Sequence, residues 1–263
     1  PIALLSHQTQ TELANKALQL HLQNGTTLVA YHGNRGARLR TLRTLFAEEP
    51  TAVIPLGGTS WLGCVGFVDA GLELAAQIDN GELPCPGRVY VAAGTLGTVV
   101  GLALGLALRE LPTDVHAVRV TPLSIANEDV LARLMKKTCA LLNRLDNRFP
   151  TELYKRARIV FREEFFGPGY AHSTQEADEA ITIMQEQASV TLEPTYTGKT
   201  MAALLADWEP TAKRAGGPLF WNTYYPAPEP TIDLPKSLTA GAEHAPRTLP
   251  AEFMSYFVRA ADP

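Results

Sequence analysis

The sequence predicts an α/β fold of parallel, open, twisted sheets with helices on both faces. Short apolar runs alternate with helical patterns along the chain, which is typical of strands joined by crossover helices. The run RVYVAA at residues 88–93 is continuously apolar, as expected of a strand whose two faces are both covered. Glycine-rich turns lead twice from an apolar run into a helical pattern, and no internal repeat is visible.

The first elements follow from short-range periodicity. An apolar strand at 2–5 precedes a helix at 9–23, in which leucine and alanine recur on one face and Gly25 marks the end. The next expected elements are a strand at 26–31, a basic helix with spaced leucines at 37–49, a short strand at 52–56 and a helix at 62–78.

The later elements continue the alternation. After the strand at 88–93 come a loop with its helix, a strand at 116–123, helices at 127–145, 174–187 and within 195–208, and a strand at 217–224. Thr174 is the expected N-cap of its helix, with Ala177, Ile181 and Met184 facing inward. Because residues 226–250 are rich in proline, we expect an extended arm there.

Composition excludes several classes of protein. The 263 residues are 46% hydrophobic and 19% charged, so a sizeable core is expected and disorder is not. The net charge of −4, with both signs interspersed, gives no nucleic-acid-binding surface. The apolar run at 99–108 is too short to cross a membrane. Three scattered cysteines fit neither a metal site nor a disulfide framework, which predicts a cytoplasmic protein without a metal.

The loop after the strand at 88–93 has the composition of a phosphate site. A strand, a short Gly/Thr turn and a helix bring free backbone N–H groups to one point, where the helix dipole favours an anion. Neither a Walker loop nor a dinucleotide fingerprint fits the spacing, and a tight turn that binds nothing is the alternative. The candidate phosphate-binding residues are Gly94, Thr95, Leu96, Gly97 and Thr98.

A second strand-turn-helix segment, IPLGGTSWLG at 54–63, suits a small carboxylate through Gly58, Thr59 and Ser60. The alternative is an ordinary helix N-cap. Ser60 could also be the nucleophile of a hydrolase, but the required G-x-S-x-G pattern is not satisfied. The histidines considered as its partner are His32, His116 and His172.

A third segment, EPTYTGKTMAALL at 193–205, places the ring of Tyr196 beside the hydroxyl of Thr197 at a turn. An aromatic ring and a neutral hydroxyl are the groups that a pyridine ring would use. The alternative is a capped turn with a buried tyrosine.

Five segments in register resemble one family. They are IPLGGTSWLGCVGFVDAGLEL, VYVAAGTLGTVVGLALGL, FFGPGYAHSTQEADEAI, LEPTYTGKTMAAL and LFWNTY, and they extend from about residue 54 to 224. Together they resemble the pyridoxal-phosphate-dependent group of D-cysteine desulfhydrases and 1-aminocyclopropane-1-carboxylate deaminases, within the tryptophan-synthase-β-like enzymes of fold type II.

The resemblance implies a cofactor, a reaction class and residue roles. Pyridoxal 5'-phosphate would be held by the loop at 94–98, with its pyridine nitrogen hydrogen-bonded to Thr197. Tyr196 would line the substrate side as a catalytic residue, and the segment around Thr59 would contact the substrate carboxylate. The implied reaction is a lyase or deaminase reaction on a small amino acid, by α,β-elimination or ring opening. A homodimer is the implied assembly.

The resemblance also implies a domain division and a missing residue. Residues 1–57 would be the remainder of a small domain, 58–225 the large cofactor-binding domain, and 226–263 a C-terminal arm. The family's catalytic lysine lies in a Gly-Asn-Lys segment that this chain lacks; Lys16 and Lys199 stand in other contexts. We therefore expect that lysine outside residues 1–263, an exposed apolar edge on the small domain, and weak cofactor binding without activity.

A non-catalytic protein that binds pyridoxal phosphate or an amino acid is the alternative to an enzyme. His172 either faces the cofactor pocket or lies at the start of the following helix; Ser173 and Thr174 favour the second interpretation.

Overall fold

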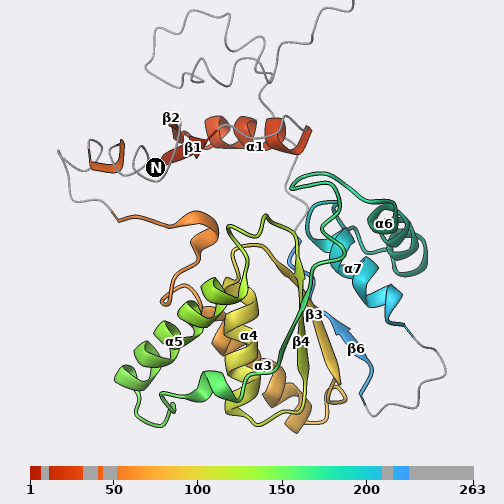
Figure 1. Cartoon of the computed structure of the whole chain (residues 1–263). Helices are drawn as coiled ribbons and strands as arrows, with labels where there is room; N and C mark the ends of the chain where they lie inside the picture. The colour runs from red at the N-terminus through yellow and green to blue at the C-terminus, as the bar shows by residue number, and fades with distance from the viewer. Residues whose placement is uncertain (7–11, 32–40, 44–51, 209–215, 225–263) are drawn as a thin grey trace, which may run out of the picture. The chain divides into compact units, whose positions relative to one another are not determined.

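The computed structural model describes residues 1–6, 12–31, 41–43, 52–208 and 216–224 (Figure 1). The chain divides into two compact units, of which Pro1–Val53 belongs to the first and Ile54–Pro226 to the second. The expected helix at 37–49 lies almost wholly outside the described residues, and the proline-rich arm lies entirely outside them.

The first unit contains strand β1 (Ile2–Ser6), helix α1 (Glu12–Gln23) and strand β2 (Thr27–Tyr31). The two strands pair in parallel, and α1 buries Leu18 and Leu22 against Leu28 of β2. Gly25, with φ 71°, ends α1 in the left-handed conformation that the sequence predicted for this stop signal. In β1, Ile2 remains 52% exposed.

The second unit is built on a four-stranded parallel sheet in the order β5–β4–β3–β6. Its strands are β3 (Arg88–Ala93), β4 (Asp114–Arg119), β5 (Ile159–Arg162) and β6 (Pro218–Phe220). The chain steps outward from β3 to β5 and then returns to place β6 on the other side of β3. This reversal makes a topological switch point at the carboxyl ends of β3 and β6, where open α/β sheets bind their ligands.

Five helices cover the two faces of this sheet, and they confirm the predicted α/β class (Figure 1). Helix α4 lies against β3 and β4, with α3 and α5 packed on it, whereas α7 lies on the opposite face with α6 outside it. Alternate residues of β3 therefore enter different cores, with Val89 and Val91 on the α4 side and Tyr90 on the α7 side. The helices are α3 (Val65–Asp79), α4 (Gly97–Leu108), α5 (Glu128–Leu145), α6 (Gln175–Ala188) and α7 (Thr197–Ala206).

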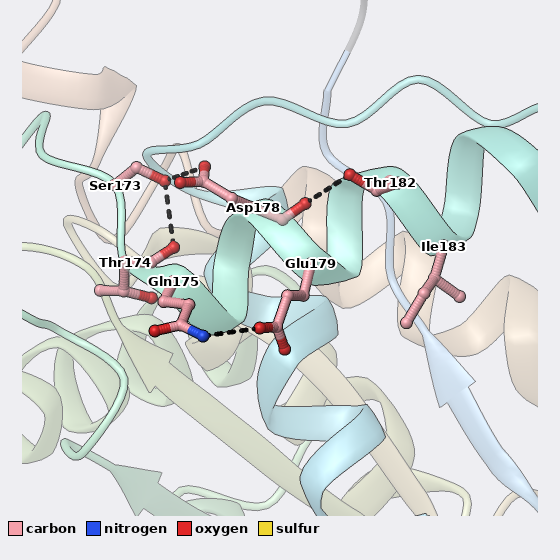
Figure 2. Close-up of a pocket in the computed structure, with 7 residues that line it drawn as sticks. All are labelled: Ser173, Thr174, Gln175, Asp178, Glu179, Thr182 and Ile183. Atoms are coloured by element: carbon pink, nitrogen blue, oxygen red, sulfur yellow. Dashed lines mark hydrogen bonds between the residues drawn. The ribbon is translucent and has the colours of Figure 1, made fainter.

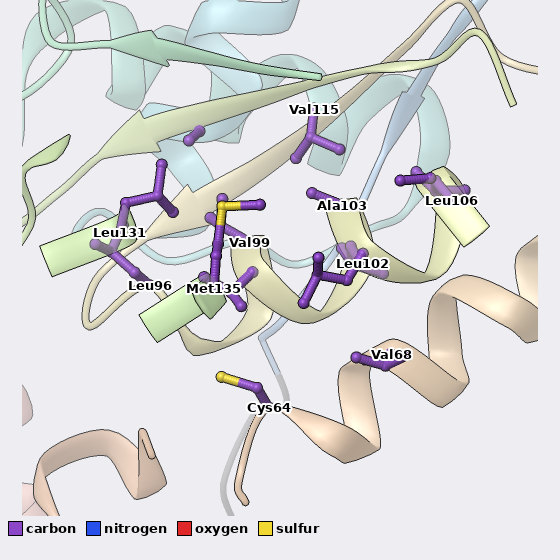
Figure 3. Packing of buried hydrophobic residues seen from close by; sticks show 14 of the residues in the cluster. Cys64, Val68, Leu96, Val99, Leu102, Ala103, Leu106, Val115, Leu131 and Met135 are labelled. Carbon is purple, nitrogen blue, oxygen red and sulfur yellow. The ribbon is translucent and has the colours of Figure 1, made fainter. Parts of the chain in front are cut away.

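The larger core surrounds α4 (Figure 3). Every residue of this helix from Val99 to Ala107 is buried, because the sheet, α3 and α5 enclose it. A helix that is apolar all round is expected in such a position. Figure 3 labels the side chains that surround α4 in this core. Val68 comes from α3 and Cys64 from its N-cap, Val115 comes from β4, and Leu131 and Met135 come from α5.

Helices α3 and α4 approach each other through glycines. A Cβ atom on Gly105 would lie 2.5 Å from the carbonyl oxygen of Val68 and 2.8 Å from the Cα of Gly71. A Cβ on Gly101 would lie 2.3 Å from the Cβ of Phe67. These separations are shorter than real Cβ contacts, so the backbones can meet at this distance only without side chains.

Two helices have side-chain caps at their N-termini, of which only that of α6 was predicted from the sequence. Thr174 accepts a hydrogen bond from the backbone N–H of Ala177 at 3.2 Å, as predicted, and Ala177 is buried. Asn127 caps α5 in the same way by accepting from Val130 N–H at 2.9 Å. Acidic residues in both first turns add favourable charge near the helix N-termini.

Two predictions of secondary structure were wrong. Residues 52–56 are not a strand, because Pro55 precedes a 3-10 turn at Leu56–Gly58 in which Gly57 has φ 62°. Strand β5 was not predicted at all. Its pattern, with Val160 39% exposed and Arg162 at its end, lacks the continuous apolar character of β3 because β5 is the edge strand of the described sheet.

Candidate functional site

The predicted phosphate loop lies at the switch point of the sheet. It connects the end of β3 at Ala93 to the start of α4 at Gly97, beside the strand β6. Leu96 adopts φ 72° as the N-cap, so the chain turns sharply into the helix. The first amide groups of α4 have no acceptor within the helix, and its dipole places partial positive charge at the same point. The loop thus offers N–H donors to an anion.

Two glycines of the loop leave room for close approach. A Cβ on Gly97 would lie 2.9 Å from Oγ1 of Thr59, and a Cβ on Gly94 would lie 3.3 Å from the ring carbon Cε1 of Tyr196. The segment around Thr59 and the turn before α7 therefore contact the loop. Three segments that were predicted separately from sequence come together here.

The loop is held by hydroxyl groups. Oγ1 of Thr59 and Oγ1 of Thr95 lie 2.5 Å apart, and the Thr121 hydroxyl, after β4, donates to the carbonyl oxygen of Gly94 at 2.8 Å. Gly57 must lack a side chain for the first contact, because its Cβ would lie 2.5 Å from Oγ1 of Thr95. The geometry of the loop is therefore set by residues of two other segments.

Tyr196 forms a pair with Tyr170, from the loop between β5 and α6. Their hydroxyl oxygens lie 2.7 Å apart, and the rings meet edge to face with centroids 6.1 Å apart. Burial and the hydrogen bond with Tyr170 raise the pKa of Tyr196 far above its usual value. Tyr196 therefore keeps its proton at neutral pH, and its hydroxyl can serve as a hydrogen-bond donor.

The turn before α7 is fixed by Glu193. Its carboxylate accepts hydrogen bonds from the backbone N–H groups of Thr195, Tyr196 and Thr197, each at 2.7 Å. Thr197 also uses its side chain here: its Oγ1 accepts from Glu193 N–H at 3.0 Å and lies 3.2 Å from Glu193 Oε1. The amide groups at the start of α7 are thus already satisfied, in contrast to those of α4.

The predicted site residues fall into two groups. Gly94, Thr95, Leu96, Gly97 and Thr98 form one loop, and Thr59 and Tyr196 contact it. Other predicted residues have mainly local partners: Ser60 Oγ accepts from Gly63 N–H at 2.9 Å, Thr197 is bound to Glu193, and a Cβ on Gly58 would meet nothing within 4 Å.

Sequence reasoning missed Tyr170 and Glu193 as parts of the site. The motif Gly-Pro-Gly-Tyr at 167–170 was a signal for the first, but its pairing with Tyr196 spans 26 residues.

The lysines that the structure describes in the second unit are either exposed or bound to main-chain carbonyls. Lys136 and Lys137 are exposed on α5, and Lys155 is exposed after it. Lys199 is fully buried, and its ammonium group donates to two backbone carbonyls. Lys213 and Lys236 lie outside the described residues.

The part of the chain that the structure describes contains neither a metal-site cluster nor a membrane-spanning helix. There, no group of three or more His, Cys, Asp or Glu side chains could hold a metal ion. Among the same residues, no helix has both the length and the apolar character that a membrane span requires.

His116 belongs to a polar cluster on the α7 side of the sheet. Asp207 accepts from the Tyr90 hydroxyl at 2.6 Å and from the guanidinium of Arg162. Nδ1 of His116 lies 3.3 Å from Arg162 and 3.8 Å from Asp207, and its ring packs on Tyr90. His116 is therefore part of a structural network and Ser60 of a turn, so neither residue supports the hydrolase alternative.

His116 gives the protein a pH-dependent stability. Burial, and then the charge of Arg162, lower the pKa of His116 below its ordinary value of 6.5. As pH falls below 6.5, the unfolded chain takes up this proton first, so the unfolding free energy decreases by up to about 1.4 kcal/mol per pH unit. We expect His116→Gln to reduce this decrease in the unfolding free energy, measured by urea unfolding at pH 7 and pH 5. An equal decrease in the unchanged protein and in this variant would contradict the assignment.

A shallow hollow of about 640 Å³ lies at the start of α6 (Figure 2). Figure 2 shows Ser173 hydrogen-bonded to Asp178, and Gln175 to Glu179, across its floor. Its full lining is Ser173, Thr174, Gln175, Asp178, Glu179, Thr182 and Ile183. Because this lining is acidic and contains no residue of the phosphate loop, the hollow is separate from the candidate site.

Comparisons with known proteins agree with the resemblance. The family model for pyridoxal-phosphate dependent enzymes matches residues 4–215. A D-cysteine desulfhydrase of Klebsiella pneumoniae subsp. pneumoniae is 33% identical over 153 residues, which are 58% of this chain and 43% of that protein. A D-cysteine desulfhydrase of Salmonella schwarzengrund is 34% identical over 171 residues, 64% of this chain and 49% of that protein. The chain thus spans about half the length of the curated relatives it matches.

A solved structure shows the same fold. The crystal structure of an ACC deaminase homologue matches with a TM-score of 0.63 at 20% identity, covering 83% of this chain and 64% of that chain. This match confirms the predicted parallel α/β architecture of fold type II.

Proposed function

Because the chain belongs to the family of pyridoxal-phosphate dependent enzymes, we propose that it acts as a lyase or deaminase on a small amino acid. One possible reaction is an α,β-elimination like that of the D-cysteine desulfhydrases, which are relatives of this chain in sequence. The other is a ring-opening deamination of aminocyclopropane carboxylate. The observation that carries the proposal is the loop at 94–98, which opens α4 at the switch point and contacts Thr59 and Tyr196.

The loop fits the phosphate of pyridoxal phosphate. Its N–H groups and the hydroxyls of Thr95 and Thr98 are donors, and Gly94 and Gly97 allow Tyr196 and Thr59 to lie close to the loop backbone. When bound, pyridoxal phosphate supplies the electron sink that stabilises negative charge at the substrate α-carbon. The protein contributes by holding the cofactor and directing protons.

Tyr196 is the proposed catalytic residue. Its hydroxyl keeps its proton at neutral pH and shares a hydrogen bond with Tyr170, so the pair can hold a proton beside the phosphate loop. Thr197 is proposed to bind the pyridine nitrogen, which requires its hydroxyl to turn away from Glu193. Gly58, Thr59 and Ser60 are proposed to contact the substrate carboxylate.

The proposal extends to organisation and location. Residues 1–57 would serve as part of a small domain, 58–225 as the cofactor-binding domain and 226–263 as an arm, in a homodimer. We place the protein in the cytoplasm because Cys64, Cys85 and Cys139 are all free thiols.

The test is addition of pyridoxal phosphate to the purified protein, followed by visible absorption, borohydride reduction and peptide mapping. We expect weak binding that depends on the phosphate group, with pyridoxal as the control ligand. Specific labelling of one lysine within residues 1–263 would identify the catalytic lysine and contradict our expectation that it lies elsewhere.

Substrate turnover distinguishes the enzyme from the non-catalytic alternative. Release of sulfide from D-cysteine, or of ammonia from aminocyclopropane carboxylate, supports the proposed reaction. Tight binding of pyridoxal phosphate without either product, in a protein that contains the labelled lysine, supports a non-catalytic binding protein. Absence of any phosphate-dependent binding overturns both.

A further inference from the structure

Lys199 is an unusual residue in the second unit because its ammonium group is fully buried. In the described part of the chain its hydrogen bonds go to main-chain carbonyls rather than to a carboxylate: Phe166 O at 2.7 Å and Gly169 O at 3.3 Å. Burial lowers the pKa of Lys199. Placing a cation there is therefore costly, and a methionine of similar length would avoid that cost. Packing alone does not account for a lysine at this position.

The two carbonyls belong to the loop that carries Tyr170. This loop connects β5 to α6, and Tyr170 directly follows Gly169. Its backbone contains two residues with positive φ, Gly167 at 69° and Ala171 at 62°, the second of which is unfavourable for a residue with a side chain. The conformation that presents Tyr170 therefore needs support from outside the loop.

The ring of Phe166 makes cation–π contacts with two side chains. The Lys199 ammonium lies 5.5 Å from its centroid, and the Arg119 guanidinium carbon lies 4.7 Å from it. Arg119 is itself buried and comes from the end of β4. The loop is thus held from the sheet by Arg119 and from α7 by Lys199.

Lys199 lies in the first turn of α7, three residues after Tyr196. The same turn therefore carries Tyr196 and holds the carbonyl of the residue that precedes Tyr170. We propose that Lys199 is a positioning residue, whose ammonium group holds the Tyr170 loop against α7 so that the two tyrosine hydroxyls stay in contact. Its importance for catalysis rests on the proposed function, but its effect on the loop does not.

The first test is hydrogen exchange of the protein without cofactor. In Lys199→Met, we expect the amides of residues 163–172 to exchange at least about tenfold faster, because hydrogen bonds to a charged group are lost. Amides of β3 and α4 should change by less than about twofold, since their packing is untouched. The control is Lys155→Met, which removes an exposed lysine and should change neither region.

The second test measures the contact between the tyrosines. A double-mutant cycle of Tyr170→Phe and Tyr196→Phe in urea unfolding should give a coupling of about fivefold in the unfolding equilibrium constant. The same cycle in the K199M background should give no coupling. A lysine that only fills space would leave the coupling intact, so this readout separates positioning from packing.

Several results would overturn the proposal. Unchanged exchange in residues 163–172, equal acceleration across α4 and β3, or persistent tyrosine coupling would each do so. If Lys199→Met fails to fold, Lys199→Gln provides a second comparison, because its amide is uncharged and its side chain is shorter than that of lysine. If turnover is found, K199M and Y170F should each lower kcat by the same factor. The double variant should lower kcat no further than either single variant. A protein that does not bind pyridoxal phosphate yet passes both cofactor-free tests would refute the function and leave the positioning role intact.

Discussion

Replacing Thr98 by aspartate lowers the affinity of the protein for pyridoxal phosphate by at least about 100-fold. Thr98 is half-buried in the first turn of α4, beside the amide groups that we assign to the phosphate. The Coulomb repulsion between a carboxylate and one phosphate charge about 4 Å away is about 4 kcal/mol at the effective dielectric constant of a protein surface. The phosphate carries up to two such charges, so the loss exceeds the usual effect of removing one hydrogen bond.

The matched control is Thr98→Asn, which has nearly the same shape as aspartate but no charge. We expect it to lose less than about tenfold in affinity, which is the contribution of one neutral hydrogen bond. Binding would be followed by absorbance titration, with pyridoxal as a ligand that lacks the phosphate and should not distinguish the two variants. Equal losses for aspartate and asparagine would place the phosphate elsewhere.

The aspartate variant also has an expected effect of opposite sign. Without cofactor, a negative charge in the first turn of α4 interacts favourably with the helix dipole, by about 0.3–1 kcal/mol. The midpoint temperature of thermal unfolding of Thr98→Asp without ligand should therefore be no lower than that of Thr98→Asn. A large destabilisation would mean that the loss of affinity reflects damage to the fold and not charge repulsion at the phosphate.

Elements with strong local signals were predictable from the sequence. The strand at 88–93 has the observed bounds, because its uninterrupted apolar run reflects burial on both faces. Helix α6 begins after Thr174, as predicted, because an N-cap is a contact between residues only three apart. The stop of α1 at Gly25 is likewise local, since glycine adopts positive φ without a steric penalty.

Elements whose identity depends on distant partners were not predictable. Strand β5 is recognised only through its pairing with β4, and residues 52–56 look like a strand until the backbone around Gly57 is known. In the candidate site, the loop at 94–98 could be proposed from sequence because glycines and threonines directly after an apolar strand are a local signal. The Tyr170–Tyr196 pair and the Lys199 contacts were not, because each joins segments at least 26 residues apart in sequence.

Replacing Gly105 by alanine destabilises the protein, whereas replacing Gly66 by alanine does not. The added methyl group on Gly105 meets backbone atoms of α3 at 2.5–3.0 Å, so one helix must move. Such overpacking costs about 1–3 kcal/mol, which outweighs the gain of about 1 kcal/mol in helix propensity. Gly66 lies in α3 with nothing within 4 Å of its Cβ position, so only the propensity gain applies there.

Urea unfolding of the two variants gives the measurement, because both changes add one methyl group to a helix and differ only in what it meets. The α3–α4 contact also bears on the site, since α4 starts at the phosphate loop and Thr59 precedes α3. We therefore expect Gly105→Ala to weaken binding of pyridoxal phosphate as well, while Gly66→Ala leaves it unchanged. If Gly105→Ala were as stable as Gly66→Ala, the two helices would lie farther apart than the structure places them, and the loop would not be held by their packing.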